Sequence, residues 1–163
     1  MRARLATPED AEAIVSIYNE GIEERVATFE TRPRSVKDIG GWFGDEHPTV
    51  VVEGDGSIIA FATTSAYSAR ECYAGVAEFS VYAAREARGR GAGRMAMGAL
   101  IEAAERSSFH KLVSRVFVGN APSRGLLHTL GFREVGVYER HSRLDGIWKD
   151  VVILERHLDG AAT

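Results

Sequence analysis

Apolar residues between positions 11 and 22 recur three and four residues apart, which predicts a helix with one buried face. The segment Thr7-Pro8-Glu9-Asp10 comes directly before them. Threonine suits the N-cap and proline suits the first helical position, so the helix is expected to begin after Thr7. The apolar positions on its buried face are Ala11, Ile14, Val15, Tyr18 and Ile22.

Further along the chain, apolar runs alternate with segments of helical spacing. Gly54-Asp55-Gly56 separates two apolar runs and indicates a hairpin. In the second half, helices separate the strands, and such strand–helix–strand units normally set their strands parallel. The pattern therefore predicts a mixed α/β sheet of about seven strands with about four helices. Strands are expected at 2–6, 49–53, 58–64, 75–83, 111–118, 132–140 and 147–156, and helices after Thr7 and at 36–43, 93–107 and 120–130.

Composition narrows the class of protein. With 163 residues, 45% hydrophobic and 26% charged, the chain is expected to form one domain over residues 1–163. A net charge of −3 does not favour a dedicated nucleic-acid binder, which is usually basic. The chain has no apolar run long enough to span a membrane, and charged residues interrupt its N-terminus. We therefore expect a soluble cytoplasmic protein that binds neither nucleic acid nor membrane.

Cysteine and histidine do not indicate a metal or redox site. Cys72 is the only cysteine, which excludes a disulfide within the chain and a C-x-x-C motif. Four of the five histidines, His47, His110, His141 and His157, show no paired metal spacing. We expect no metal cofactor.

The most informative segment is a glycine-rich turn at residues 85–94, between a strand and a helix. Its three glycines allow backbone N–H groups to converge at a helix N-terminus, which is an anion-binding arrangement. The same ten residues contain four arginines and one glutamate. A phosphate group is the ligand that this combination favours.

Three phosphate-binding patterns compete for this turn. A Walker loop fails because no Lys-Ser or Lys-Thr follows the glycines. A dinucleotide-binding fingerprint is weak, because the spacing is G-x-G-x-G and the strand at 112–118 has no acidic residue. The third pattern, R-x-x-G-x-G, is satisfied by Arg88, Gly91 and Gly93. It resembles the pyrophosphate loop of the GNAT superfamily of acyl-CoA-dependent N-acetyltransferases.

Other motifs between residues 17 and 151 extend this resemblance over nearly the whole chain. Together they resemble the branch that acetylates phosphinothricin, methionine sulfoximine or sulfone, and arsinothricin. The runs 72–79 and 111–115 are closest to the arsinothricin type. The fold implied is a mixed, mostly antiparallel twisted sheet. The motifs are Ile17-Tyr18-Asn19, Ala27-Thr28-Phe29-Glu30, Glu78-x-Ser80-Val81-Tyr82, Asn120 with Ser123, Leu130-Gly131-Phe132 and Gly146-x-Trp148-x-Asp150-Val151.

The resemblance implies an acetyl-CoA site. The backbone of one strand would pair with the pantetheine arm, and one of its N–H groups would polarise the thioester carbonyl. The glycine-rich turn would hold the pyrophosphate, and Asn120 would bind near the acetyl end. The residues implied are Val81, Tyr82, Ala83, Arg88, Gly89, Arg90, Gly91, Ala92, Gly93, Arg94 and Asn120.

On the acceptor side, Glu78 is the candidate base, because an amine must lose a proton to attack the thioester. Alternation along a strand places it on the same face as Ser80 and Tyr82. The resemblance implies that Arg70 holds an anionic group of the substrate, which an arginine fork binds in bidentate fashion. The other expected substrate-binding residues are Ser68, Ala69, Tyr73, Phe79, Ser80 and Phe29, with Tyr73 and Phe29 as aromatic walls.

The chain departs from the family pattern at Leu127, where relatives often have histidine or tyrosine. His128 is one position away and is expected to face elsewhere on the helix, so we do not transfer the family histidine to it. The group that protonates the departing thiolate stays unassigned. Since a thiol has a pKa near 8.5, solvent or a tyrosine could suffice.

Three other functions stay open. The acceptor could be a polyamine, an aminoglycoside or a protein N-terminus, although Arg70 would repel a polycation. The chain could be a non-catalytic acyl-CoA-binding module, which would not need Glu78. It could also bind a nucleotide or RNA through 85–94, which its negative charge disfavours. By family analogy, we expect a homodimer.

Overall fold

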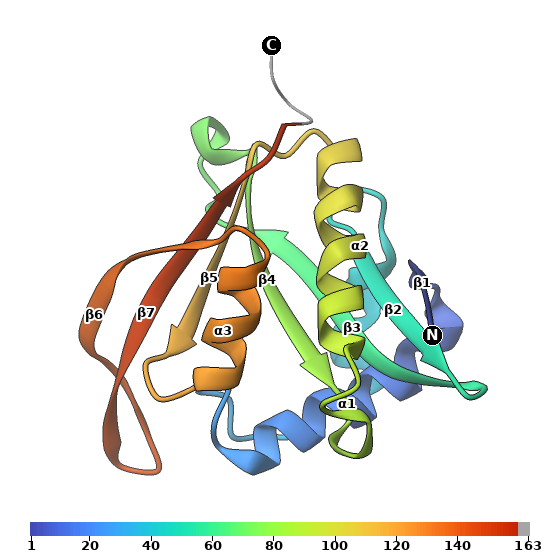
Figure 1. Ribbon diagram of the computed structural model, residues 1–163, viewed down its shortest axis with the longest axis horizontal. Coiled ribbons are helices and arrows are strands. Elements are labelled where there is room, and N and C mark those ends of the chain that lie inside the picture. The colour runs from blue at the N-terminus through green and yellow to red at the C-terminus, as the bar shows by residue number, and fades with distance from the viewer. Residues whose placement is uncertain (160–163) are drawn as a thin grey trace.

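The computed structural model describes residues 1–159, which form one seven-stranded sheet between helices (Figure 1). The strand order is β1-β2-β3-β4-β5-β7-β6. All neighbours are antiparallel except β4 and β5, which are parallel, so the mixed, mostly antiparallel sheet is confirmed. The strands are β1 (Arg2–Leu5), β2 (Thr49–Gly54), β3 (Ser57–Ala66), β4 (Val76–Ala83), β5 (Lys111–Phe117), β6 (Arg133–Leu144) and β7 (Ile147–His157).

Within residues 1–159, three α-helices and four 3-10 helices flank the sheet. In Figure 1, α2 and α3 lie in front of the sheet and α1 crosses behind it. The helix expected at 36–43 is a 3-10 helix, in which two adjacent glycines, Gly40 and Gly41, disfavour a regular α-helix. The elements are η1 (Pro8–Asp10), α1 (Ala11–Glu24), η2 (Val36–Phe43), η3 (Glu71–Tyr73), η4 (Arg85–Ala87), α2 (Ala92–Arg106) and α3 (Ala121–Thr129). No described helix has both the length and the apolar character needed to cross a membrane.

The core lies on both faces of the central strands. Val50, Val51 and Val52 are all buried, and because neighbouring side chains alternate between the two faces of a strand, both faces of β2 are covered. On the α1 side, the ring of Phe61 is fully buried and stacks on Tyr18 and Tyr82, with centroid distances of 6.2 and 5.5 Å. These aromatic contacts fix the position of β4 against α1.

The β6–β7 hairpin is longer than expected, because β6 continues to Leu144 instead of ending at Arg140. Asp145 and Gly146 form its turn, and both have positive φ, 51° and 80°. This is the backbone geometry of a type I′ hairpin turn, whose twist matches that of the strands. The polar residues 139–143 led us to end the strand at Arg140, although Asp145-Gly146 is a hairpin signal in the sequence.

The feature that positions the site is the separation of β4 from β5. The two strands pair only over Val76–Glu78 and Lys111–Val113. Beyond Glu78, β4 continues to Ala83 and pairs with β3, while β5 pairs with β7. The β5-facing edge of 79–83 therefore has no strand partner among the described residues.

Candidate active site

A cavity of about 500 Å³ lies where β4 and β5 separate. Its walls come from segments that are far apart in the sequence: the end of α1, the second half of β4, the glycine-rich turn, β5 and the start of α3. The lining includes residues from both faces of the sheet, which makes the cavity continuous between the two strands. Most of the expected cofactor residues line it, namely Val81, Tyr82, Ala83, Arg88, Gly89, Gly91, Ala92, Gly93, Arg94 and Asn120.

The glycine-rich turn leads into α2 through a left-handed backbone. Gly89 and Gly91 have φ of 78° and 84°, which residues with a Cβ rarely adopt. Gly91 is also the N-cap of α2, so the first turn of the helix has no side-chain acceptor for its N–H groups. These donors and the helix dipole favour an anion at this end of the cavity.

Arg88 in this turn is held by an acidic side chain of α1. Its guanidinium donates to both carboxylate oxygens of Glu24, at 2.7 and 2.6 Å. Arg85 adds a third hydrogen bond to Glu24, at 3.3 Å. The hydrogen bonds from Arg88, and then from Arg85, hold the pKa of Glu24 below its usual value. The turn is thereby tied to α1.

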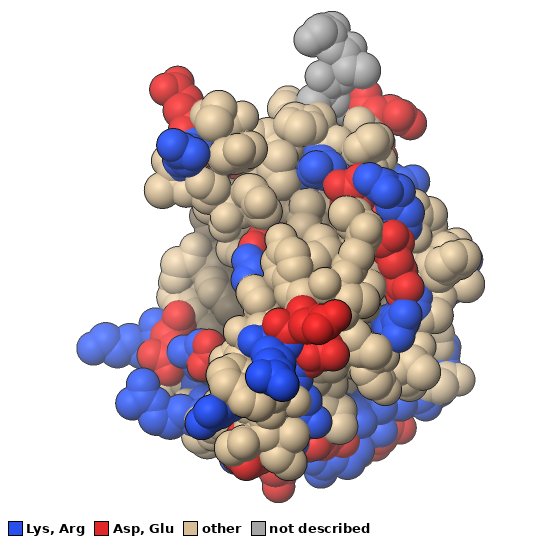
Figure 2. All heavy atoms as spheres, turned by 90° about the vertical axis from the view of Figure 1, so that its left-hand side faces the viewer, with Lys and Arg blue, Asp and Glu red and all other residues tan. Residues whose placement is uncertain are grey.

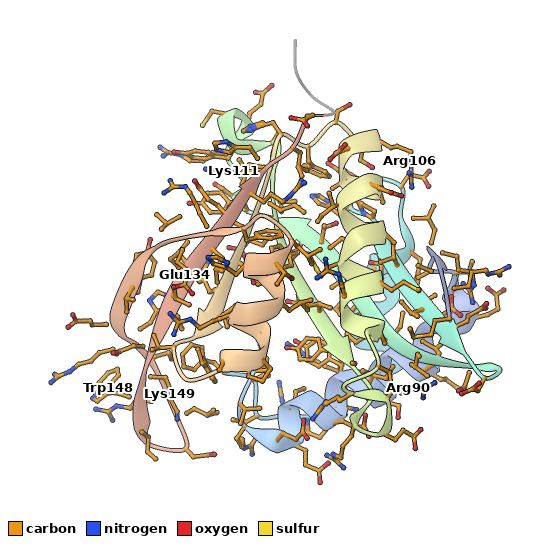
Figure 3. All side chains as sticks on the ribbon, in the orientation of Figure 1. Arg90, Arg106, Lys111, Glu134, Trp148 and Lys149 are labelled. Atoms are coloured by element: carbon orange, nitrogen blue, oxygen red, sulfur yellow. The ribbon has the colours of Figure 1, made fainter. Side chains whose placement is uncertain are left out.

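Arg90 is the expected cofactor residue that does not line the cavity. It pairs with Asp55 in the β2–β3 turn at 3.1 Å. Figure 3 shows it at the lower end of α2, toward that turn. Arg94 lines the cavity and donates to Thr129 Oγ1 of α3 at 2.8 Å.

Tyr82 lines the cavity, and its ring packs against α1. The ring centroid lies 5.2 Å from that of Tyr18. A Cβ at Gly21 would lie 2.7 Å from the ring, so this glycine allows the close approach. Burial is the main reason that the pKa of Tyr82 is raised. The phenol therefore stays protonated at neutral pH.

Asn120 joins α3 to the segment after α1. Its Oδ1 accepts from Ser123 N at 3.3 Å as the N-cap of α3. Its Nδ2 donates to the carbonyl oxygen of Val26 at 3.3 Å. The amide thus shapes the wall of the cavity while it caps the helix.

Glu78 lies on β4 at the last pair before the strands separate. Its Oε1 accepts from Arg115 Nη2 on β5 at 2.6 Å. Arg115 lines the cavity, whereas Glu78 lies just beyond the lining. Arg115 ends the run 111–115 that resembles the arsinothricin type, but it was not among the expected site residues. The available signal was one arginine within the otherwise uncharged run Val113-Ser114-Arg115-Val116-Phe117.

The expected substrate residues fall into three groups. Phe79 and Ser80 line the cavity. Phe29 packs edge-on against Phe117, at 4.8 Å between centroids, in a small cluster outside the lining. The remaining residues precede β4 at its other end and do not line the cavity; they are Ser68, Ala69, Arg70 and Tyr73.

Neither Leu127 nor His128 brings a titratable group into the cavity. Leu127 lines it and is 1% exposed, and His128 on the same helix is exposed. Cys72 is exposed in η3. Within residues 1–159, no cluster of three or more His, Cys, Asp or Glu side chains could hold a metal ion.

Comparison with known proteins gives consistent results. Residues 14–132 match the model of the acetyltransferase (GNAT) family. A phosphinothricin N-acetyltransferase of Streptomyces coelicolor is 30% identical over 97% of this chain and 96% of its own length. An L-methionine sulfoximine/L-methionine sulfone acetyltransferase of Pseudomonas aeruginosa is 29% identical over 92% of this chain and 90% of its own length.

Solved structures of other acetyltransferases superpose on this chain over nearly its full length. A phosphinothricin acetyltransferase from Sinorhizobium meliloti, in complex with acetyl-CoA, superposes with a TM-score of 0.91 at 28% identity. The match covers 99% of this chain and 90% of that one. A ribosomal-protein-alanine N-acetyltransferase from Brucella melitensis has a TM-score of 0.92 at 30% identity, over 97% of this chain and all of that one.

Proposed function

The chain belongs to the acetyltransferase (GNAT) family, and we propose that it transfers the acetyl group of acetyl-CoA to the α-amine of a small amino acid. The acceptors we propose are of the phosphinothricin, methionine sulfoximine or sulfone, or arsinothricin type, as the names of the relatives suggest for the first two. One observation carries the proposal: a single cavity is lined by the unpaired edge of β4 and by the glycine-rich turn, and the carboxylate of Glu78 lies beside it.

The chemistry of the cavity lining supports acetyl-CoA as the acetyl donor. The cavity volume of about 500 Å³ lies within the range of small-molecule sites. The pyrophosphate would bind at the N–H groups of Gly89 to Arg94, and the amides of the pantetheine arm would pair with the free edge of Val81, Tyr82 and Ala83. Acetyl-CoA supplies an activated acetyl thioester, and no metal is required for the transfer.

The chain's own groups would act at the thioester and at the amine. A backbone N–H of 81–83 would donate to the carbonyl oxygen as charge develops on it, an effect that can be worth about 3–4 kcal/mol. Glu78 would take the proton of the attacking amine, directly or through a water. A nitrogen–carbon bond forms, the carbon–sulfur bond breaks and the thiolate leaves, taking a proton from solvent. Transfer is direct, in a ternary complex.

We also propose that the chain forms a homodimer through its β6–β7 edge. Figure 2 shows this side of the molecule, where charged groups of both signs surround uncharged surface. Large apolar side chains there are half exposed, which is typical of an interaction surface. They are Val135, Val137, Tyr138, Ile147 and Trp148. Light scattering coupled to size-exclusion chromatography should give twice the monomer mass of 17.8 kDa. The mass of a monomer at high protein concentration would refute the dimer.

Thiol release from acetyl-CoA tests the function. The acceptor panel is phosphinothricin, arsinothricin, methionine sulfoximine, methionine sulfone, glutamate, spermidine and a peptide N-terminus. We expect turnover with the first four only. Turnover with spermidine or the peptide alone would overturn the acceptor class, and acetyl-CoA binding without any turnover would favour a binding module.

A further inference from the structure

The ion pair between Glu78 and Arg115 joins β4 to β5 where the two strands begin to separate. Glu78 Oε1 and Arg115 Nη2 are 2.6 Å apart, and the side chains of Glu78 and Arg115 are 30% and 47% exposed. Each side chain is therefore only partly covered by protein, and the pair lies beside the cavity that Arg115 lines. A small charged ligand can reach both groups.

The pair faces the α1 side of the sheet. Side chains alternate along a strand, so Glu78 shares a face with Tyr82, whose ring packs on Tyr18 of α1. By the same rule Arg115 shares a face with Phe117, which packs on Phe29. The glycine-rich turn leads into α2, which lies on the opposite face. The pair therefore lies on the far side of the cavity from the start of α2, where an acceptor would enter.

We propose that Arg115 and Glu78 together bind the charged head of an α-amino acid, with Arg115 on the carboxylate and Glu78 on the ammonium group. The inference rests on the proposed function and adds a residue that selects the acceptor. In an α-amino acid both charges are attached to one carbon, so their partners must be adjacent and of opposite sign. The Glu78–Arg115 pair has this arrangement, and a guanidinium binds a carboxylate in bidentate fashion.

Binding would exchange one ion pair for two. The substrate carboxylate takes Arg115 away from Glu78, and the ammonium group becomes the new partner of Glu78. An amine without an adjacent carboxylate cannot bind Arg115, so Arg115 stays paired with Glu78. The pair thus selects α-amino acids over polyamines and over peptide N-termini, whose α-carboxylate is an amide.

The test compares an accepted amino acid with its α-methyl ester, which keeps the amine and removes the negative charge of the α-carboxylate. For the wild-type chain we expect kcat/KM to favour the free acid by about ten- to hundredfold, the usual range for a charge-assisted hydrogen bond. In Arg115→Met this preference should disappear, because KM rises for the acid and stays the same or falls for the ester, whose amine no longer competes with Arg115 for Glu78. Arg115→Lys should keep part of it, since lysine retains the charge but not the fork.

Arg2→Met is the control, because Arg2 forms a comparable exposed ion pair with Glu53 at the far edge of the sheet. It should keep the full preference for the acid. Acetyl-CoA affinity and the melting temperature, measured for each variant, report on folding. An equal loss on acid and ester in both Arg115 variants would overturn the inference alone. A wild-type chain that acetylates spermidine but no amino acid would overturn the proposed function as well.

Discussion

The two ends of the cavity are built from different parts of the chain. At the end proposed for acetyl-CoA, the groups on offer are mainly backbone: the N–H groups of the glycine-rich turn and the unpaired edge of 79–83. At the end proposed for the acceptor they are side chains from two strands, Glu78 and Arg115. The first end is local in sequence, and the second exists only when β4 and β5 lie side by side. We therefore expect substitutions at the two ends to affect different kinetic quantities.

The largest effect should come from Glu78→Gln at the acceptor end. Glutamine keeps the shape of glutamate but cannot take a proton, and general-base catalysis is typically worth about 10²–10⁴-fold. We expect kcat at pH 7 to fall within that range while the affinity for acetyl-CoA is nearly unchanged. Steady-state kinetics and calorimetric titration measure the two quantities. An unaffected kcat would remove Glu78 from the mechanism.

Gly91→Val should break the other end. Gly91 has φ of 84°, which is strained for a β-branched residue, and the change would move the N–H groups at the start of α2. We expect acetyl-CoA affinity to fall by about a hundredfold in calorimetric titration.

Gly98→Ala is the matched control for Gly91→Val, because Gly98 lies inside α2 and a Cβ there meets nothing within 4 Å. It should stabilise the chain by up to about 1 kcal/mol and leave acetyl-CoA binding unchanged. If Gly91→Val bound acetyl-CoA as tightly as Gly98→Ala, the pyrophosphate would lie elsewhere.

Arg70→Ala measures how far the acceptor end extends. Arg70 precedes β4 and does not line the cavity, whereas Arg115 does. We therefore expect Arg70 to contribute less than Arg115 to binding of the substrate. We expect KM for an anionic amino acid to rise about three- to tenfold, and KM for acetyl-CoA to stay the same, as for an exposed charge pair of about 1 kcal/mol. Equal changes in both KM values would argue against any role of Arg70 in substrate binding.

Gly21→Ala should have the smallest effect on catalysis, because Gly21 contacts neither proposed ligand and acts on the packing of α1 against Tyr82 of β4. The new Cβ would lie 2.7 Å from the ring of Tyr82, which must shift against Tyr18 and Phe61. Such overpacking costs about 1–3 kcal/mol. Urea denaturation should show this loss, with kcat/KM reduced less than in the variants above. An unchanged stability would mean that the ring moves freely.

The sequence predicted the sheet and most element boundaries, because strand and helix periods are local. It missed two features of the fold for physical reasons. The 3-10 form of 36–43 depends on a glycine pair that the helical spacing concealed. The length of the β6–β7 hairpin was concealed by the polar run 139–143, although Asp145-Gly146 is itself a local signal for the type I′ turn that closes it.

The glycine-rich turn was recognisable in the chain itself, because a left-handed backbone at a helix N-terminus requires glycine at particular positions. Arg90 shows the limit of that reasoning, since a residue within the motif turns away to Asp55 in the β2–β3 turn. The acceptor end was not recognisable in the same way. Arg115 stands 37 residues from Glu78 in the chain, and only the parallel register of β4 and β5 brings the two charges together. Local backbone chemistry is thus determined by sequence, whereas a pair of distant side chains is decided by tertiary packing.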